Sequence, residues 1–293
     1  MLEITGLTHR YGPVGGGHLA IDQVTLEVAD GELASIVGPS GCGKSTLLRC
    51  VAGLVRPSGG AITLRGAPVD RVPDGLAVVF QDYSRSLLPW LSVRDNVALP
   101  LRRTGRSRAQ RREAALAALA TVGLPDTAGK YPWQLSGGMQ QRVAIARALA
   151  CDPVLLLMDE PFGSVDAQTR EDLEDLLLAV RRERDMTILL VTHDIDESVY
   201  VGDRVVVLTP SPGRVLADLQ VDLPAPRDQI TTRELPAFVH LRAEVGRLVR
   251  GQGTPPAGAA QQEQAAQPEP AADATQEEQA AQPGPAASSG PAG

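Results

Sequence analysis

The sequence predicts an α/β fold in which a sheet is covered by helices on both faces and a mostly helical segment is inserted between two of its strands. Apolar segments of strand length alternate with helical patterns along residues 1–250. The middle segments, such as Val154–Met158, are continuously apolar, which is typical of strands buried on both faces. A glycine-rich loop at residues 38–45 stands where a strand turns into a helix, as such loops do in α/β folds.

Short strands are expected along the whole of this region. Leu2–Thr5 and Val24–Val28 alternate in polarity, as half-exposed strands do, and Gly12–Gly17 between them is expected to be a flexible loop. Further strands are expected at Leu33–Val37, Ala61–Leu64, Leu76–Phe80, Val154–Met158, Ile188–Thr192 and Arg204–Leu208.

Helical periodicity separates these strands. Apolar residues recur at i, i+3, i+4 and i+7 within Glu171–Arg184. Arg108–Val122 and the stretch after Gly137 are also expected to be helical, so about 82–150 is interpreted as the inserted helical segment. Residues 234–250 form an expected last helix, with four apolar residues on one face: Phe238, Leu241, Val245 and Leu248. The predicted organisation is a domain over 1–233, this helix, and a tail over 251–293.

The tail differs in composition from the rest of the chain. It is rich in Ala, Gln, Pro and Glu and has almost no large apolar side chains, so we expect it to be disordered, with a docking segment as the alternative. Setting aside its five acids changes the net charge from −7 to −2. The net charge of −7 and the few aromatics argue against a nucleic-acid partner, whereas the near-neutral value of −2 does not point to any class of partner. The arginines between Arg102 and Arg112 are expected on a solvated helix face, with nucleic-acid or lipid-headgroup binding as the alternative.

The cysteines and the apolar runs bear on the cellular compartment. Cys42, Cys50 and Cys151 form neither a disulfide framework nor zinc spacing, and their odd number fits a reducing cytoplasm. With no signal-like N-terminus and no apolar run of membrane length, the chain is expected on the cytoplasmic side, reaching a membrane only through a partner. Because Cys42 precedes a helix, its pKa is expected to be lowered, and alkylation there is expected to block nucleotide binding.

The glycine-rich loop reads Gly-Pro-Ser-Gly-Cys-Gly-Lys-Ser and matches the pattern G-x-x-x-x-G-K-[ST] without a gap. Small residues let the backbone curl until several N–H groups point at one anion, and the following helix N-terminus adds its positive dipole end. Lys44 supplies charge for the β- and γ-phosphates, and the Ser45 hydroxyl can ligate Mg²⁺. The alternative is a glycine-rich turn with an accidental lysine. The expected nucleotide contacts are Gly38, Pro39, Ser40, Gly41, Cys42, Gly43, Lys44, Ser45 and Thr46.

Two acids, Asp159 and Glu160, follow the apolar strand Val154–Met158. A buried strand can deliver Asp159 beside the phosphate loop, where it would hold Mg²⁺, and Glu160 would then polarise an attacking water. Plain solubilising acids at a strand end are the alternative.

The order of the motifs resembles that of the ATP-binding subunit of ABC transporters, over residues 1 to about 250. The motifs are the phosphate loop, Gln81, the signature-like Leu135–Arg142 (Leu-Ser-Gly-Gly-Met-Gln-Gln-Arg), Asp159-Glu160, Ser164-Val165-Asp166 and His193. The resemblance implies a P-loop NTPase core of RecA type with an antiparallel β subdomain and an inserted helical subdomain. It also implies ATP hydrolysis with ATP and Mg²⁺.

Residue roles follow from this resemblance. Tyr11 would stack on adenine, Gln81 would contact Mg²⁺ and the water, and His193 would contact the γ-phosphate. With Glu160 and Lys44, Gln81 and His193 would form the catalytic set. Ser136, Gly137 and Gly138 would bind the γ-phosphate held by a second copy in a head-to-tail ATP-sandwich dimer, to which Asp166 would also contribute. The family usually has Ala-Leu before this Asp, where this chain has Ser164-Val165. The resemblance therefore implies altered coupling between the two ATP sites of the dimer.

A closer resemblance concerns residues 79–97, which are similar to the ATPases of nitrate, sulfonate and taurine importers. It implies that Leu87, Leu88, Pro89 and Trp90 receive a short helix of a membrane permease, the alternative being that they pack the helical insert. The implied function is import of a small solute that a separate binding protein delivers. This chain does not identify the solute. An exporter subunit and a soluble non-transport ABC ATPase are the alternatives; a phosphotransferase would lack the signature.

Overall fold

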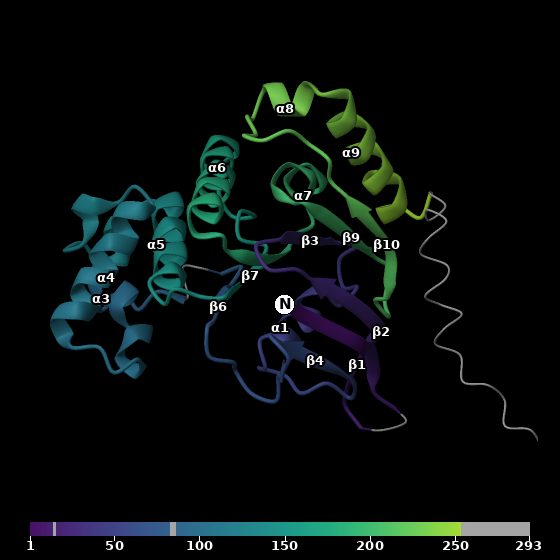
Figure 1. Ribbon diagram of the computed structural model, residues 1–293, viewed down its shortest axis with the longest axis horizontal. Coiled ribbons are helices and arrows are strands. Elements are labelled where there is room, and N and C mark those ends of the chain that lie inside the picture. The colour runs from purple at the N-terminus through teal and green to yellow at the C-terminus, as the bar shows by residue number, and fades with distance from the viewer. Residues whose placement is uncertain (14–15, 83–85, 253–293) are drawn as a thin grey trace, which may run out of the picture.

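A six-stranded sheet runs through the computed structural model, which describes residues 1–13, 16–82 and 86–252 (Figure 1). From edge to edge its strands are β10 (Val215–Gln220), β9 (Arg204–Leu208), β3 (Leu33–Val37), β8 (Thr187–Val191), β7 (Leu155–Asp159) and β6 (Leu76–Val79). Neighbouring strands are parallel except at the edge strand β10, which is antiparallel to β9. Every side chain of β3, β7 and β8 is buried, so the predicted doubly covered sheet is confirmed.

Helices and a second sheet cover the two faces of this sheet. The helices are α1 (Lys44–Val51), α5 (Gly137–Leu149), α6 (Ala167–Arg184), α7 (Ile195–Val201) and α9 (Pro236–Val249). Side chains alternate along each strand, so Leu155 and Leu157 of β7 join a core that includes α1. Leu156 and Met158 join the opposite core, which includes α5, α6, α7 and α9. Strand β7 therefore stabilises two cores.

The second sheet is antiparallel and packs against α1. Its order is β2 (His18–Val28), β1 (Leu2–Tyr11), β4 (Gly59–Leu64) and β5 (Ala67–Pro68). The predicted β subdomain is confirmed, but β1 and β2 are longer than the alternating segments that predicted them. The pairing shifts register after Ile4, close to Gly6 and Gln23, which both have positive φ. Such bulges interrupt the two-residue alternation on which the sequence prediction depended.

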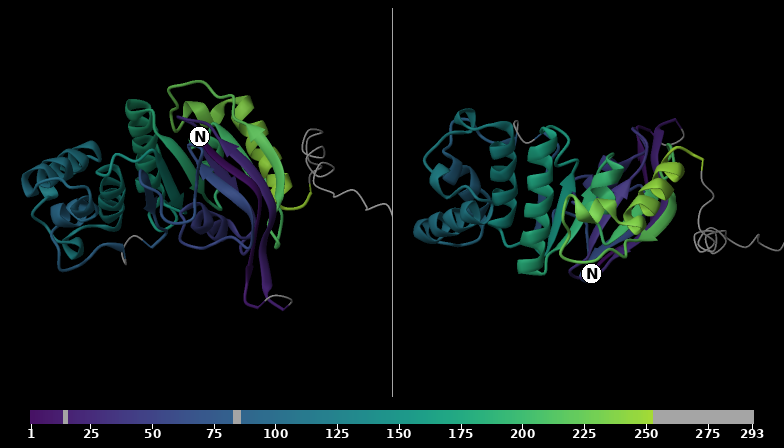
Figure 2. Two further views of the ribbon diagram at one scale, coloured as in Figure 1. Left: turned by 60° about the horizontal axis from the view of Figure 1, so that its bottom comes forward. Right: turned by 90° about the horizontal axis from the view of Figure 1, so that it is seen from above.

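The predicted helical insert lies between β6 and β7, at one end of the molecule (Figures 1 and 2). Its elements are α3 (Val93–Ala98), the 3₁₀ turns Pro100–Arg103, Pro125–Thr127 and Pro132–Gln134, α4 (Arg108–Thr121), and α5. Ser107 begins α4 with a capping box, its Oγ accepting from the Gln110 N–H. Helix α5 also contacts β6 and α6, so it joins the insert to the sheet.

The C-terminal segment folds back over α6 and α7. The predicted last helix begins at Pro236 and is preceded by the short α8 (Thr231–Glu234). Phe238, Val245 and Leu248 are buried on its inner face, as predicted. The predicted tail beyond Gln252 lies outside the described residues. Within the described ranges, no helix combines the length and the apolar character that a membrane crossing requires.

Candidate functional site

The phosphate loop connects β3 to α1, as the motif requires. Gly41 and Gly43 have φ values of 77° and 103°, and a Cβ on Gly43 would come within 2.6 Å of the Ala20 carbonyl oxygen. Only glycine fits such a position without strain. Lys44 is 6% exposed, and its Nζ donates to the carbonyl oxygens of Gly38 (2.7 Å) and Pro39 (3.1 Å). A buried ammonium group inside a curled loop at a helix N-terminus is an arrangement suited to phosphate.

Ser45 and Asp159 meet beside this loop. The Ser45 hydroxyl donates to Asp159 Oδ1 at 3.2 Å, so the strand β7 does deliver its acid to the loop. Burial raises the pKa of Asp159, although the bond from Ser45 opposes this shift. Mg²⁺ favours hydroxyl and carboxylate oxygens, and its positive charge would stabilise the ionised carboxylate, so the pair fits this ion. The described residues contain no group of three or more His, Cys, Asp or Glu placed to bind a metal by themselves.

Three side chains from different elements converge at Glu160. Its Oε2 accepts from Gln81 Nε2 at 2.7 Å and lies 3.2 Å from His193 Nδ1. Glu160 follows β7, Gln81 follows β6 and His193 follows β8, so all three lie at the carboxyl edge of the sheet. The Glu160 side chain is 18% exposed and the His193 side chain 62% exposed. The arrangement therefore presents a carboxylate, held by two partners, to a site open to water.

Tyr11 lies at the end of β1, over the start of α1. Its hydroxyl is 3.2 Å from Thr46 Oγ1, and its ring packs edge-on against His9. Tyr11 remains 40% exposed. The structure therefore brings this aromatic side chain next to the phosphate loop, and its stacking on adenine stays a prediction.

The signature residues lie at the start of α5, next to the start of α6. The Ser136 Oγ accepts from the Met139 N–H at 3.3 Å and caps α5. Asp166 caps α6 in the same way, accepting from the N–H (3.0 Å) and the hydroxyl (2.7 Å) of Thr169, and these bonds lower its pKa. A Cβ on Gly138 would lie only 2.4 Å from Thr169 Cγ2, so the two helix starts are in close contact.

The site residues thus fall into two groups within one chain. Helix α1 and its loop contact β2, β7 and β8, whereas α5 contacts α3, α4, α6 and β6. Figure 1 shows α1 beside β1 and β4, and α5 with α3 and α4 in the helical insert. Sequence reasoning named the residues of both groups but did not identify the contacts of Gln81 and His193 with Glu160, because these depend on the strand order.

The expectation that the pKa of Cys42 is lowered is wrong. The residue is fully buried, and burial raises the pKa of its thiol more than the nearby Lys44 lowers it. A Cβ on Gly38 would lie 2.9 Å from its Sγ, so the sulfur packs under the loop rather than facing a ligand. Loss of solvation therefore outweighs the helix N-terminus, and the thiol is not poised for alkylation.

The docking candidates divide into buried and exposed residues. Leu87 is 1% exposed and belongs to the core of the insert, so it cannot receive a partner. Buried Asn96 bonds to the backbone N–H and carbonyl of Leu88 and pins this segment. Pro89 and Trp90 remain exposed, Trp90 by 70%. An apolar side chain at the start of a helical segment often packs inward, as Leu87 does here.

Sequence reasoning missed a pair of exposed aromatics just before the signature. Tyr131 and Trp133 stack with ring centroids 6.2 Å apart, and Trp133 is 71% exposed. Two aromatics in so aromatic-poor a chain were a signal that could have been noticed.

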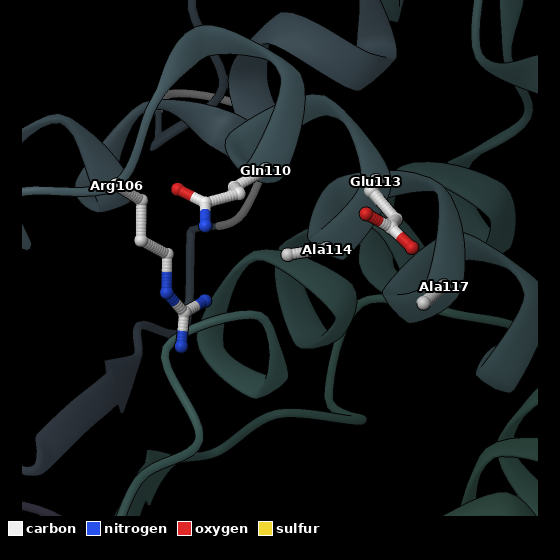
Figure 3. Close-up of a pocket in the computed structure, with 5 residues that line it drawn as sticks. All are labelled: Arg106, Gln110, Glu113, Ala114 and Ala117. Carbon is white, nitrogen blue, oxygen red and sulfur yellow. The ribbon is translucent and has the colours of Figure 1, made fainter.

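A separate shallow hollow of about 270 Å³ lies on α4 (Figure 3). It is lined by Arg106, Gln110, Glu113, Ala114 and Ala117. None of these is a motif residue, so this hollow is unrelated to the site.

Comparison with known proteins agrees with this geometry. The family model described as ABC transporter matches residues 21–163. The taurine import ATP-binding protein TauB of Yersinia pestis is 47% identical over 222 residues, covering 76% of this chain and 85% of TauB. The nitrate import ATP-binding protein NrtC of Synechococcus elongatus is 46% identical over 236 residues, covering 80% of this chain but 36% of NrtC.

A solved structure shows the same fold. The dimeric post-hydrolysis structure of the ATP-binding cassette MJ0796, bound to ADP and Pi, superposes with a TM-score of 0.67 at 34% identity. The superposition covers 75% of this chain and 99% of the MJ0796 chain.

Proposed function

Because the chain belongs to the ABC transporter ATP-binding family, we propose that it is the ATP-hydrolysing subunit of an importer and works as a pair on a membrane permease. The observation that carries the proposal is the convergence of Gln81 and His193 on Glu160 beside a complete phosphate loop. The relatives TauB and NrtC, both named as import proteins, support the direction of transport.

In this proposal the phosphate loop binds the phosphates of ATP and Glu160 drives hydrolysis. The loop N–H groups and Lys44 hold the β- and γ-phosphates. Ser45, Asp159 and Gln81 would hold Mg²⁺, which neutralises charge on the phosphate oxygens when bound. The Glu160 carboxylate accepts a proton from the attacking water, and His193 and Gln81 keep that carboxylate in place. Tyr11 stacks on the adenine.

The signature group serves a second copy of the chain. Ser136, Gly137 and Gly138 lie at a helix N-terminus and offer N–H groups to a γ-phosphate. Since this group lies apart from the phosphate loop of its own chain, we propose that it binds ATP held by a partner copy, with Asp166 at the same interface. Two copies arranged head to tail would enclose two ATP molecules. The dimeric arrangement of MJ0796 supports this reading.

The proposed permease contact lies on the helical insert. Pro89 and Trp90 remain exposed there, and Trp90 is among the most exposed large apolar side chains of the described residues. We propose that the two copies of the chain lie at the cytoplasmic face of the membrane, where the permease holds them. The cargo is proposed to be a small solute such as nitrate, a sulfonate or taurine, since relatives with this cassette differ in cargo.

The chemistry is tested by Glu160→Gln and Lys44→Ala. Glu160→Gln should bind ATP normally and lose about 10²- to 10⁴-fold in kcat, because a positioned general base contributes that much. Lys44→Ala should lose ATP affinity itself, since the loop loses its charge. ATP binding is measured by calorimetry and turnover by phosphate release. The matched control is Glu183→Gln, an exposed glutamate at the end of α6, which should leave both unchanged.

Either of two results would overturn this assignment. Glu160→Gln retaining most of its turnover would place the base elsewhere, and Lys44→Ala binding ATP normally would refute the phosphate cradle. Transport is tested separately by capturing the tagged chain from solubilised membranes of its host. Recovery of a multi-span permease, with a solute-binding protein encoded beside it, supports import. Recovery of ribosomes or DNA-repair proteins, or of nothing from the membrane, contradicts transport and leaves the ATPase chemistry intact.

A further inference from the structure

Arg170 connects two loops that carry site residues. Its N–H bonds to the carbonyl oxygen of Asp166 at 2.9 Å, in the first turn of α6. Its guanidinium Nη1 donates to Asp194 Oδ2 at 3.2 Å. Asp194 follows His193 directly and caps α7, its Oδ1 accepting from the Glu197 N–H at 3.1 Å. A side chain of α6 therefore holds the residue next to the histidine that contacts Glu160.

The same turn of α6 contacts the signature helix. Thr169 is the neighbour of Arg170, and its Cγ2 packs against Gly138 of α5. A Cβ added to Gly138 would lie 2.4 Å from this methyl group. The Thr169 hydroxyl also bonds to the cap residue Asp166. Within five residues, 166–170, this turn thus contacts the start of α5, the Asp166 loop and the His193 loop.

We propose that Arg170 is a positioning residue for ATP hydrolysis, which holds the His193 loop through Asp194 so that His193 stays against Glu160. This proposal rests on the proposed function. It makes α6 the link between the signature helix and the carboxylate that activates water, because a shift of α5 against Thr169 would move the turn that carries Arg170.

The surroundings of the pair decide which measurements the test needs. The Arg170 and Asp194 side chains are 32% and 30% exposed, so the pair is partly buried. Burial raises the pKa of Glu174 and of Glu197 and the Arg170 charge partly opposes both shifts, so removing that charge affects stability as well as position. The Arg170 Nε is buried and lacks a hydrogen-bond partner among the described residues. Urea unfolding of each variant therefore accompanies the kinetics, and kcat is compared only under conditions in which every variant is folded.

The test compares Arg170→Ala, Arg170→Lys, Asp194→Asn and the double variant Arg170→Ala/Asp194→Asn in the full chain. Asn caps helices as well as Asp, so Asp194→Asn keeps the cap of α7 through its one oxygen, while its NH2 group replaces the oxygen that accepts from Arg170. Arg170→Ala should lower kcat about tenfold, as small displacements of catalytic groups do, with the ATP dissociation constant unchanged within about twofold. The double variant should be no slower than the slower single variant. Arg170→Lys should recover part of kcat.

A second readout does not depend on turnover. The chain has four histidines, so the ring ¹⁵N signals of His193 can be assigned by substitution. Arg170→Ala should shift them toward those of an unbonded imidazole. The control is Arg182→Ala, an exposed arginine near the other end of α6, which should change neither kcat nor these signals.

The outcomes separate this inference from the proposed function. If the parent chain hydrolyses ATP, Glu160→Gln is inactive, and Arg170→Ala keeps kcat within about twofold with unchanged His193 signals, the positioning role is refuted and the ATPase stands. Additive losses in the double variant would also refute it. If Glu160→Gln remains active, the proposed function itself fails.

Discussion

Asp159 and Glu160 are neighbours in sequence and differ in environment. Asp159 is the last residue of β7, and its side chain is 7% exposed and turned to Ser45. Glu160 has a φ of 46°, which is strained for a residue with a side chain, and its N–H bonds to the Val191 carbonyl at 2.7 Å. This bend points the second carboxylate at Gln81 and His193 rather than back into the sheet. Consecutive acids can therefore hold a cation and activate water separately.

The cysteines give a prediction at the same scale. Cys42 and Cys50 are fully buried, and burial raises the pKa of Cys50 to about 11. Cys151 is only half-buried. Iodoacetamide at about pH 8 should therefore modify Cys151 first. Cys42 and Cys50 should react only as fast as the chain unfolds and exposes them. Peptide mass spectrometry over time measures this order, with the chain in urea as the control in which all three react alike. Rapid modification of Cys42 in the folded chain would contradict it.

Between helices, the contact of Gly138 with Thr169 leaves no room for a larger residue. Gly138→Ala would place a methyl group 2.4 Å from Thr169 Cγ2. It should destabilise the chain by about 1–3 kcal/mol, the usual effect of overpacking. Thr169→Ser removes the Cγ2 methyl and keeps the hydroxyl that bonds to Asp166. Urea unfolding of the two single variants and the double variant measures the effect. The same loss from Gly138→Ala when Thr169→Ser is also present would show that the strain lies elsewhere.

Helix α8 is attached to α6 through a buried carboxylate. Glu174 is 1% exposed and accepts from Arg233 Nη2 (3.0 Å) and Gln229 Nε2 (3.1 Å). Burial raises its pKa to about 7, and the bond from Gln229 and the charge of Arg233 only partly oppose this. The folded chain therefore holds a proton there at pH values where the unfolded glutamate has lost it.

This difference makes stability depend on pH. Since the unfolded pKa of Glu174 is near 4.5, the contribution of its protonated form is fully present below that value and is lost as pH rises through about 7. When the pH is raised from about 5 to about 8, the parent chain loses this contribution and Glu174→Gln does not. The free energy of unfolding of Glu174→Gln should therefore rise by about 2 kcal/mol relative to that of the parent chain. Urea midpoints at the two pH values measure it, with Glu183→Gln as the control. An equal pH dependence in Glu174→Gln and the parent chain would rule out this titration.

At this scale, the sequence predicted the buried elements well and the irregular ones poorly. The apolar strands Leu33–Val37 and Arg204–Leu208 match their observed bounds, because burial on both faces leaves a continuous apolar run. The edge strand β10 was missed, since it pairs on one side only and its exposed Asp218 and Gln220 leave no continuous apolar run.

The motifs named side chains that the structure brings together, such as Glu160 with Gln81 and His193, and the roles of these residues stay predictions. Leu87 and Cys42 were misjudged because their burial depends on tertiary packing, which motif spacing does not reveal.

For the whole molecule, the separation of the two site groups predicts ATP-dependent pairing. Glu160→Gln with ATP should have a mass near twice the 30.9 kDa of the chain, since uncleaved ATP would bridge the phosphate loop and a partner's signature. Light scattering with and without ATP measures this. Lys44→Ala, which should not hold ATP, is the control and should stay at 30.9 kDa. A monomeric Glu160→Gln with ATP bound would contradict the sandwich.

The strand order also determines when the chain can fold during its synthesis. The smaller sheet joins β1, β2, β4 and β5, so it can form once residues up to 68 have left the ribosome. Strand β3 is different, because both of its neighbours, β8 and β9, are made much later, at residues 187–208. Until then its apolar edges are unpaired, and unpaired edges invite aggregation. A nascent chain stalled before residue 187 should therefore depend on chaperones, whereas one stalled beyond residue 208 has every neighbour that β3 needs.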